Sequence, residues 1–225
     1  MGRPSMSAEA VKANKINIIS TAMEMISESG TASVTARSLG SRTGMNSALI
    51  YRYFRDIDEV VLFACVRVLQ EYSEDMLEAS KSFSPLSDDG DYDDAGIYML
   101  SWEIFCRHAF RDPEEYNTLF FSRHSAELES IIKQYFELFS PEHDNDADII
   151  LEAMFRTSNL ASRNLILLIP VLEGRRSEQE IILINDMTVA FFYALLVQLV
   201  GNDQGVTAET QTRRMLEACR LLAGL

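Results

Sequence analysis

The sequence predicts an all-α protein, with a three-helix head followed by a larger helical body. Apolar residues recur at intervals of three and four through most of the 225-residue chain, which is helical spacing. No run of alternating polar and apolar residues between turns indicates a strand. Scarce prolines fit the same fold class, because all five stand at plausible helix boundaries: Pro4, Pro85, Pro113, Pro141 and Pro170.

The head is predicted to hold three helices within the first 57 residues. Gly30 can supply a left-handed C-cap to the first helix, which has apolar residues on one face. Thr35 can N-cap a short second helix that ends at Gly44, and Asn46 can cap a third helix that reaches Phe54.

The body, residues 58–225, is predicted to begin with a long fourth helix from about Asp58 to Ser80. Ser84–Asp94 is polar and acidic with a proline and a glycine, so we expect a loop there. Further helices are expected at about 95–111, 114–139, 147–173, 178–200 and 207–223.

Charge is divided unevenly along the chain. The formal net charge is −14, which by itself argues against a nucleic-acid partner. Residues 1–57, however, hold seven basic and four acidic residues (+3), and the remainder holds 13 basic and 30 acidic residues (−17). A basic head on an acidic body is compatible with nucleic-acid binding by the head.

Two features of the sequence indicate where the protein is found in the cell: the spacing of its cysteines and its longest apolar stretch. Cys65, Cys106 and Cys219 lie far apart, which predicts reduced, buried thiols in a cytoplasmic protein. Residues 181–200 are mostly apolar, but Asn185 and Asp186 lie within them. An ionised Asp is costly in hydrocarbon, so we expect a helix that is buried by protein on more than one side, and no membrane partner.

The second and third predicted helices, joined through Gly44-Met45-Asn46, have the pattern of a helix-turn-helix. Gly44 tolerates the turn, and Met45 can fill the corner opposite Leu39. Burial of one side of the third helix leaves its other residues on or near the outer side: Ser47, Ala48, Leu49, Arg52 and Tyr53.

Residues 35–54 resemble the helix-turn-helix of the TetR family of one-component transcriptional repressors, most closely in the block Ile50-Tyr51-Arg52-Tyr53-Phe54. The opening Gly2-Arg3-Pro4 is similar to the start of many members. The resemblance covers about the first quarter of the chain, and the body agrees in layout alone. It implies that DNA phosphates and base edges are contacted by Arg3, Thr35, Arg37, Ser47, Ala48, Leu49, Tyr51, Arg52 and Tyr53.

The chain departs from the family pattern at three head positions. Leu49 replaces a frequent Thr and could contact a thymine methyl. Gly40 stands where a helix-favouring Ala is usual, and Ile57 replaces a Lys that commonly contacts phosphate, a role Arg55 could take. An alternative for Arg37, Arg42 and Arg52 is that they are solvated helix arginines. Tyr51 and Tyr53 could pack the head onto the fourth helix, and Arg3 could lie in an unstructured tail.

Metal and catalytic sites are not predicted. The three histidines are not spaced as ligand pairs. Two aspartate clusters, at 89–93 and 144–148, imitate a calcium loop but lack its glycine at position six and its glutamate at position twelve. We therefore expect no metal, no cofactor and no enzyme activity.

Two body segments, Leu165–Leu172 and Val189–Val200, are apolar on nearly all sides. This favours a homodimer in which two helices of each subunit form a four-helix bundle, as in the family the head resembles. The alternative is a central helix buried within one chain. The candidate interface residues are Leu167, Leu168, Val189, Phe192, Leu196 and Val197.

An effector pocket is implied mainly by the resemblance. Met and aromatic residues at helical spacing more often form ordinary core than a ligand cage. If they line a chamber, a small apolar or aromatic effector would contact Met99, Trp102, Phe105, Cys106, Tyr116 and Phe120, with Arg123 and His124 as polar contacts beside Arg107.

The leading hypothesis is a repressor of operator DNA, released by this effector; the alternative is a helical ligand carrier or partner-binding protein that no longer regulates through DNA.

Overall fold

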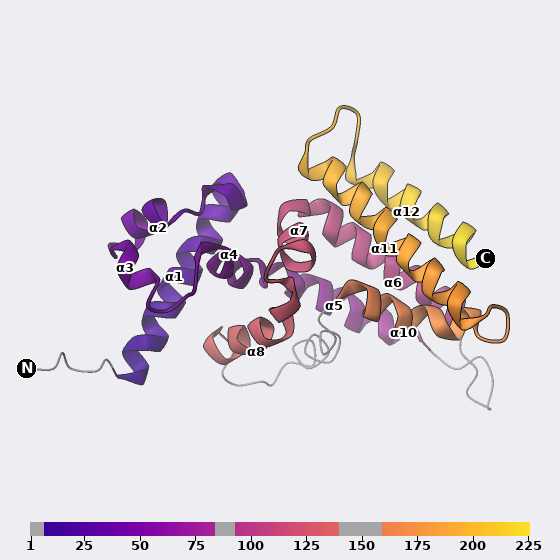
Figure 1. The fold of residues 1–225 in the computed structure, drawn as a ribbon, viewed down its shortest axis with the longest axis horizontal. Helices are drawn as coiled ribbons and strands as arrows, with labels where there is room; N and C mark the ends of the chain where they lie inside the picture. The colour runs from indigo at the N-terminus through magenta and orange to yellow at the C-terminus, as the bar shows by residue number, and fades with distance from the viewer. Residues whose placement is uncertain (1–6, 84–92, 140–158) are drawn as a thin grey trace, which may run out of the picture.

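The computed structural model describes residues 7–83, 93–139 and 159–225, and within these ranges every regular element is helical, which confirms the predicted fold class (Figure 1). In chain order the elements are α1 Ala8–Ser29, η1 Thr31–Ser33, α2 Ala36–Thr43, α3 Ser47–Ile50, α4 Ile57–Cys65, α5 Val68–Ser80, α6 Asp94–Arg111, α7 Pro113–Phe121, η2 Ser125–Glu127, α8 Leu128–Phe139, α10 Leu160–Leu172, α11 Glu178–Val200 and α12 Ala208–Ala223.

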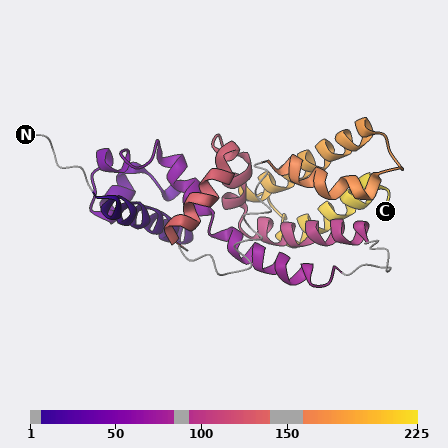
Figure 2. The same cartoon turned by 90° about the horizontal axis from the view of Figure 1, so that it is seen from below.

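The molecule is elongated, with the head at one end and α10–α12 at the other (Figures 1 and 2). Helix α4 packs against α1 on the head side and against α7 and α8 on the body side. Phe54 and Phe63 lie edge to face with ring centroids 5.6 Å apart, so the end of the helix-turn-helix packs on α4. Helix α4 therefore connects the two parts both covalently and through its core.

Capping residues fix the head helices largely as predicted. The Thr35 hydroxyl accepts from the Ser38 N–H at 3.1 Å, and the Asn46 amide oxygen accepts from the Leu49 N–H at 2.9 Å. Gly44 has φ 71° in the left-handed region, as the turn requires. Gly30 also has positive φ, but its ψ of 172° differs from the predicted left-handed cap.

Several predicted helices are shorter or divided. The fourth helix changes at residues 66–67 into i→i−3 hydrogen bonds, which separate α4 from α5. The predicted 114–139 helix is divided by residues 122–127, and the third head helix ends at Ile50. Pro170 lies in the last turn of α10 rather than beyond it.

Candidate functional site

The outer surface of the helix-turn-helix, formed by α2 and α3, lies at the end of the molecule away from α10–α12 (Figure 1). Leu39 and Ile50 are fully buried and hold the two helices together. Leu49 is partly exposed, and the other predicted DNA-contact residues that remain solvent-accessible on this surface are Thr35, Arg37, Ser47, Ala48, Tyr51 and Arg52. Arg3 lies outside the described residues.

The basic residues of the head differ in their partners. Arg42 pairs with Glu28 on α1. Arg37 and Arg52, by contrast, form no ion pair with any residue in the described part of the chain, and both are exposed. Their guanidinium groups can therefore bind phosphate or a base edge without first breaking an internal contact.

Tyr53 differs from its predicted outward position. Its hydroxyl accepts a hydrogen bond of 2.8 Å from the Asn14 side-chain amide on α1, and the residue is partly buried. Helical spacing placed Tyr53 outside, but α3 ends at Ile50 and residues 51–53 form a turn. The side chain therefore binds the turn to α1, whereas the structural alternative expected the fourth helix.

Gly40 has a close neighbour that explains its lack of a side chain. A Cβ atom at this position would lie 2.7 Å from the Met45 carbonyl oxygen, below any normal contact. The absence of a side chain therefore lets α2 lie directly against the backbone of the turn.

Arg123 and His124, predicted as polar effector contacts, instead bind the start of α4. His124 Nε2 lies 3.0 and 3.1 Å from the two Asp56 carboxylate oxygens. Arg123 Nη2 lies 3.1 Å from Asp56 and 2.8 Å from Asp58. The prediction is corrected because α7 ends at Phe121, and the chain then turns toward the head.

Arg55 is also part of this head–body contact. Its guanidinium binds both Glu127 carboxylate oxygens, at 2.8 and 2.7 Å, so it is not directed to a phosphate in place of the missing Lys. We call the whole set the junction network: Arg55, Asp56, Asp58, Glu59, Arg123, His124 and Glu127. Nearby, the Thr31 N–H and hydroxyl both donate to Glu114 on α7 at 2.8 Å.

Asp56 has a second role as the N-cap of α4, where it accepts from the Glu59 N–H at 2.9 Å. Partial burial raises the pKa of Asp56, but that backbone hydrogen bond, His124 and Arg123 together lower it below the usual aspartate value. One ionised carboxylate therefore caps α4 and binds the connector after α7.

Four predicted pocket residues, Trp102, Phe105, Tyr116 and Phe120, are buried and come together around the Phe105 ring. Its centroid lies 5.8, 5.6 and 5.5 Å from those of Trp102, Tyr116 and Phe120. Cys106 is also buried on α6, and Met99 is partly buried beside the core. Two further rings, Tyr72 and Phe192, complete the cluster; Tyr72 is not among the predicted site residues, and Phe192 is predicted at the dimer interface. We define the aromatic cluster as Tyr72, Trp102, Phe105, Tyr116, Phe120 and Phe192, with Arg163 against it.

Arg163 lies within apolar α10, a signal in the sequence that could have identified it. Its guanidinium carbon is 6.0 Å from the Phe105 ring centroid and 5.6 Å from that of Phe120. Burial lowers the pKa of Arg163, opposed by Tyr72 and Tyr116. The next residue, Asn164, accepts from Trp102 Nε1 at 2.8 Å and donates to Asn185 at 2.9 Å, which fixes the indole.

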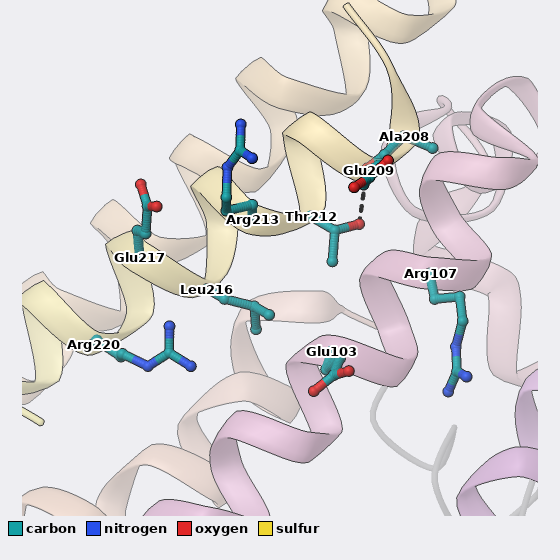
Figure 3. Close-up of a pocket in the computed structure, with 9 residues that line it drawn as sticks. All are labelled: Glu103, Arg107, Ala208, Glu209, Thr212, Arg213, Leu216, Glu217 and Arg220. Carbon is teal, nitrogen blue, oxygen red and sulfur yellow. Dashed lines mark hydrogen bonds between the residues drawn. The ribbon is translucent and has the colours of Figure 1, made fainter.

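A separate groove of about 410 Å³ lies between α6 and α12 (Figure 3). Figure 3 shows Leu216 and Thr212 between the two helices, while Arg213 and Glu217 point away from α6. The groove does not reach the aromatic cluster. Three carboxylates and three guanidinium groups line it: Glu103, Glu209, Glu217, Arg107, Arg213 and Arg220. Because the acidic and basic side chains are equal in number, the lining favours neither an anionic nor a cationic ligand.

The predicted dimer residues divide into two sets. Leu168, Phe192 and Leu196 have no exposed surface within the single chain, so they are core residues, which corrects the prediction. Val197 is 43% exposed, and Leu167 and Val189 are partly exposed. Hydrophobicity on all sides of a helix does not tell which side packs on its own chain.

Helices α10 and α11 lie on the opposite side of the body from α5 (Figure 2), and they carry a set of exposed apolar residues. With about 3.6 residues per turn, its α11 members fall on one side of the helix, opposite the buried Phe192 and Leu196. We call this surface the α10–α11 face; its exposed members are Ile166, Ile169, Ile182, Leu183, Met187, Tyr193 and Val197.

Helix α11 is long and apolar enough to cross a membrane. One such helix is weak evidence of a membrane span, because the core helix of a soluble protein has the same length and composition. It packs on α10, α7 and α12 through one side, and Asp186 lies exposed on the other.

No group of three potential metal ligands occurs among residues 7–83, 93–139 and 159–225, and the clusters at 89–93 and 144–148 lie largely outside these ranges. All three cysteines are free and buried, as predicted. Burial raises the pKa of Cys65 and Cys106 well above the usual thiol value and that of Cys219 to about 12. They are therefore protonated, weak nucleophiles at neutral pH.

Comparison with known proteins connects this geometry to a family. Residues 18–63, from within α1 to within α4, match the model of bacterial regulatory proteins of the tetR family. No curated protein sequence matches the chain significantly. The predicted resemblance of the helix-turn-helix to this family is confirmed.

Two solved structures share the fold of nearly the whole chain. One is Thermus thermophilus FadR, a TetR-family transcriptional repressor in complex with lauroyl-CoA, with a TM-score of 0.54 and 12% identity over 91% of this chain and 92% of that one. The other is RolR in complex with resorcinol, with a TM-score of 0.55 and 14% identity over 96% of each chain.

Proposed function

We propose that this chain is a transcriptional regulator of the tetR family, and that it is a dimeric repressor that a small apolar or aromatic effector releases from its operator. The observation that carries the proposal is the exposed outer surface of the helix-turn-helix. Arg37 and Arg52 are exposed there and can bind a phosphate, and both lie within the segment that matches the family. The basic head on an acidic body favours DNA at this end of the molecule.

In the proposed complex α3 enters the major groove. Ser47, Ala48, Leu49 and Arg52 face base edges, because small residues at the start of the helix permit close approach and an Arg can bind guanine. The remaining contacts are to phosphates from Thr35, Arg37 and Tyr51, with Arg3 in the adjoining minor groove.

A second copy of the chain is the proposed occupant of the α10–α11 face. One helix-turn-helix reads one half-site, and a two-fold dimer places two of them on a pseudo-palindrome. Burial of this face in a four-helix bundle would remove a large apolar surface from water, with Leu167, Val189 and Val197 in the contact. Exposed Asp186 disfavours lipid as the occupant of this face.

The proposed switch runs along α7. This helix supplies Tyr116 and Phe120 to the aromatic cluster, and Arg123 and His124 follow its end. An effector that separates α7 from α6 would pull on Asp56 and turn α4, changing the distance between the two recognition helices. They must meet grooves about 34 Å apart or a multiple of this. The fold-sharing proteins with lauroyl-CoA and resorcinol support an apolar or aromatic effector.

The test is fluorescence anisotropy of labelled DNA from the region flanking the chain's own gene. We expect specific binding that weakens steeply as salt rises, since phosphate contacts release counterions. Addition of small molecules that copurify with the protein, identified by mass spectrometry, should release the DNA. Binding no tighter than to unrelated DNA would favour the ligand-carrier alternative.

A further inference from the structure

A second contact joins the head to the body at the start of α7. Glu114, in the first turn of α7, accepts hydrogen bonds of 2.8 Å from both the N–H and the hydroxyl of Thr31. Both bonds end on the same carboxylate oxygen. Hydrogen bonds to an ionised acceptor are roughly twice as strong as neutral ones, so this pair is a firm attachment.

Gly30, the residue before Thr31, makes room for this contact. It has φ 76°, and a Cβ atom at this position would lie 2.9 Å from Glu114 Oε2, closer than real Cβ atoms approach. Another residue in place of Gly30 would strain the backbone and displace the carboxylate. The head therefore has space at this position for one particular side chain of the body.

Short hydrogen bonds connect Thr31 to helix α2. Thr31 begins η1, and the Ser33 hydroxyl of this turn donates to the Gly30 carbonyl oxygen at 2.7 Å. The Ser38 hydroxyl, in the first turn of α2, donates to the Ser33 carbonyl oxygen at 2.8 Å. Glu114 is thus linked to the start of the helix-turn-helix through a hydrogen-bonded segment and not through a free loop.

The two ends of α7 hold the two ends of the helix-turn-helix. Thr31 precedes α2 and binds Glu114 at the start of α7, whereas Asp56 follows α3 and binds Arg123 and His124 just after α7. The nine residues of α7 extend for roughly 13 Å. One attachment would leave the head free to turn about it, but two separated attachments restrict that rotation.

We propose that Glu114 is a positioning residue for operator recognition, which acts through Thr31 to fix the orientation of the helix-turn-helix on the body. The inference rests on the proposed function, because it takes the dimer and its operator as given. The two recognition helices must meet grooves about 34 Å apart or a multiple of this. A head that turns on the body meets the second half-site in only a fraction of its orientations, and the affinity falls by that fraction.

The distance between the two heads is measured by double electron–electron resonance on the full-length dimer. The spin label is attached at Ser41→Cys, an exposed position in α2, because the three native cysteines are buried. We expect one narrow distance distribution, which Glu114→Ala should lose. Glu114→Gln keeps an oxygen acceptor and should keep the narrow distribution. Glu217→Ala removes the same charge from exposed α12 and should change nothing.

Operator binding gives a second measurement. The operator that the wild-type protein binds is compared with versions in which one base pair is inserted or removed between the half-sites, a shift of about 3.4 Å. Glu114→Ala should bind the natural operator about tenfold more weakly, as expected for loss of hydrogen bonds to a charged group. Its preference for the natural spacing should shrink. A residue with a structural role alone would lower the free energy of unfolding and leave that preference unchanged.

A Glu114→Ala dimer with the wild-type distance distribution, or with the wild-type preference among the three spacings, would overturn the inference and keep the repressor. If Glu114→Ala does not fold, Thr31→Val, which removes the hydroxyl donor, is compared with Thr31→Ser, which keeps it; equal distributions in these two variants would also overturn the inference. A wild-type protein that shows no dipolar signal between subunits, or that does not bind the operator, would instead refute the repressor and the inference with it.

Discussion

His124 Nε2 lies within 3.1 Å of both carboxylate oxygens of Asp56, and the same carboxylate caps the first turn of α4. His124 follows α7 in the body, whereas Asp56 stands where the head meets α4. A shift at the end of α7 thus reaches α4 without passing through the hydrophobic core. This contact joins body and head beside the packing of α4 on α7 and α8.

The first prediction separates the two roles of Asp56. Asp56→Asn keeps an oxygen acceptor for the Glu59 N–H but removes the charge that Arg123 binds. Loss of such partly exposed pairs should lower the free energy of unfolding by no more than about 1 kcal/mol. Asp56→Ala also removes the N-cap and should cost about 1 kcal/mol more. Urea unfolding measures both, and equal losses in the two variants would show that the cap contributes nothing.

A second prediction concerns pH. The pKa of Asp56 is lowered in the folded protein, so its contribution to stability is complete above the unfolded value of about 3.9 and declines as pH falls through the folded value. The difference in unfolding free energy between wild type and Asp56→Asn should therefore be present at about pH 5 and shrink below about pH 4. Asp203→Asn in an exposed turn is the control. A difference that grows toward acid would contradict the assigned direction.

The head could be read from sequence because its signals are local. Thr35 and Asn46 cap helices through hydrogen bonds three residues ahead, and Gly44 adopts the positive φ that few other residues accept. Tyr53 was misplaced because helical spacing was continued past Ile50. The division between α4 and α5 had no local signal, since Val66 and Arg67 are ordinary helix residues.

The body was less predictable because its site depends on long-range packing. The family resemblance, more than spacing, implies a pocket that contains Trp102, Phe105, Tyr116 and Phe120. Phe192 is predicted in a dimer contact, whereas its ring stacks on that of Phe110 with centroids 5.4 Å apart. Arg123 and His124 were placed in the pocket by proximity along the chain. Their actual partners are 65 to 68 residues away, in the loop before α4 and its first turn. Sequence spacing alone does not report such distances.

The third prediction tests the readout surface. Arg52→Ala should cost roughly 1–3 kcal/mol of operator binding and loosen base preference, because Arg52 is exposed on the outer side of the turn after α3. Tyr53→Phe is the matched variant: it removes the hydrogen bond from Asn14 and should lower stability by about 1 kcal/mol while base preference is kept. Anisotropy with operator and mutated operators gives both results. Unchanged affinity and selectivity in Arg52→Ala would remove Arg52 from the interface.

The last prediction distinguishes the dimer surface from the core of α11. Leu183 is 59% exposed on the α10–α11 face, whereas Leu196 has no exposed surface and points into the chain. Leu183→Glu should yield a folded monomer, because the carboxylate remains hydrated when the subunits separate but would be buried without a partner in the dimer. Leu196→Glu places the same charge in the core and should unfold the body, with a loss of several kcal/mol. Sedimentation velocity and circular dichroism separate the outcomes. A Leu183→Glu protein that still sediments as a dimer with the wild-type affinity would show that a second copy binds elsewhere, because one unpaired carboxylate per subunit at a buried interface could not be tolerated.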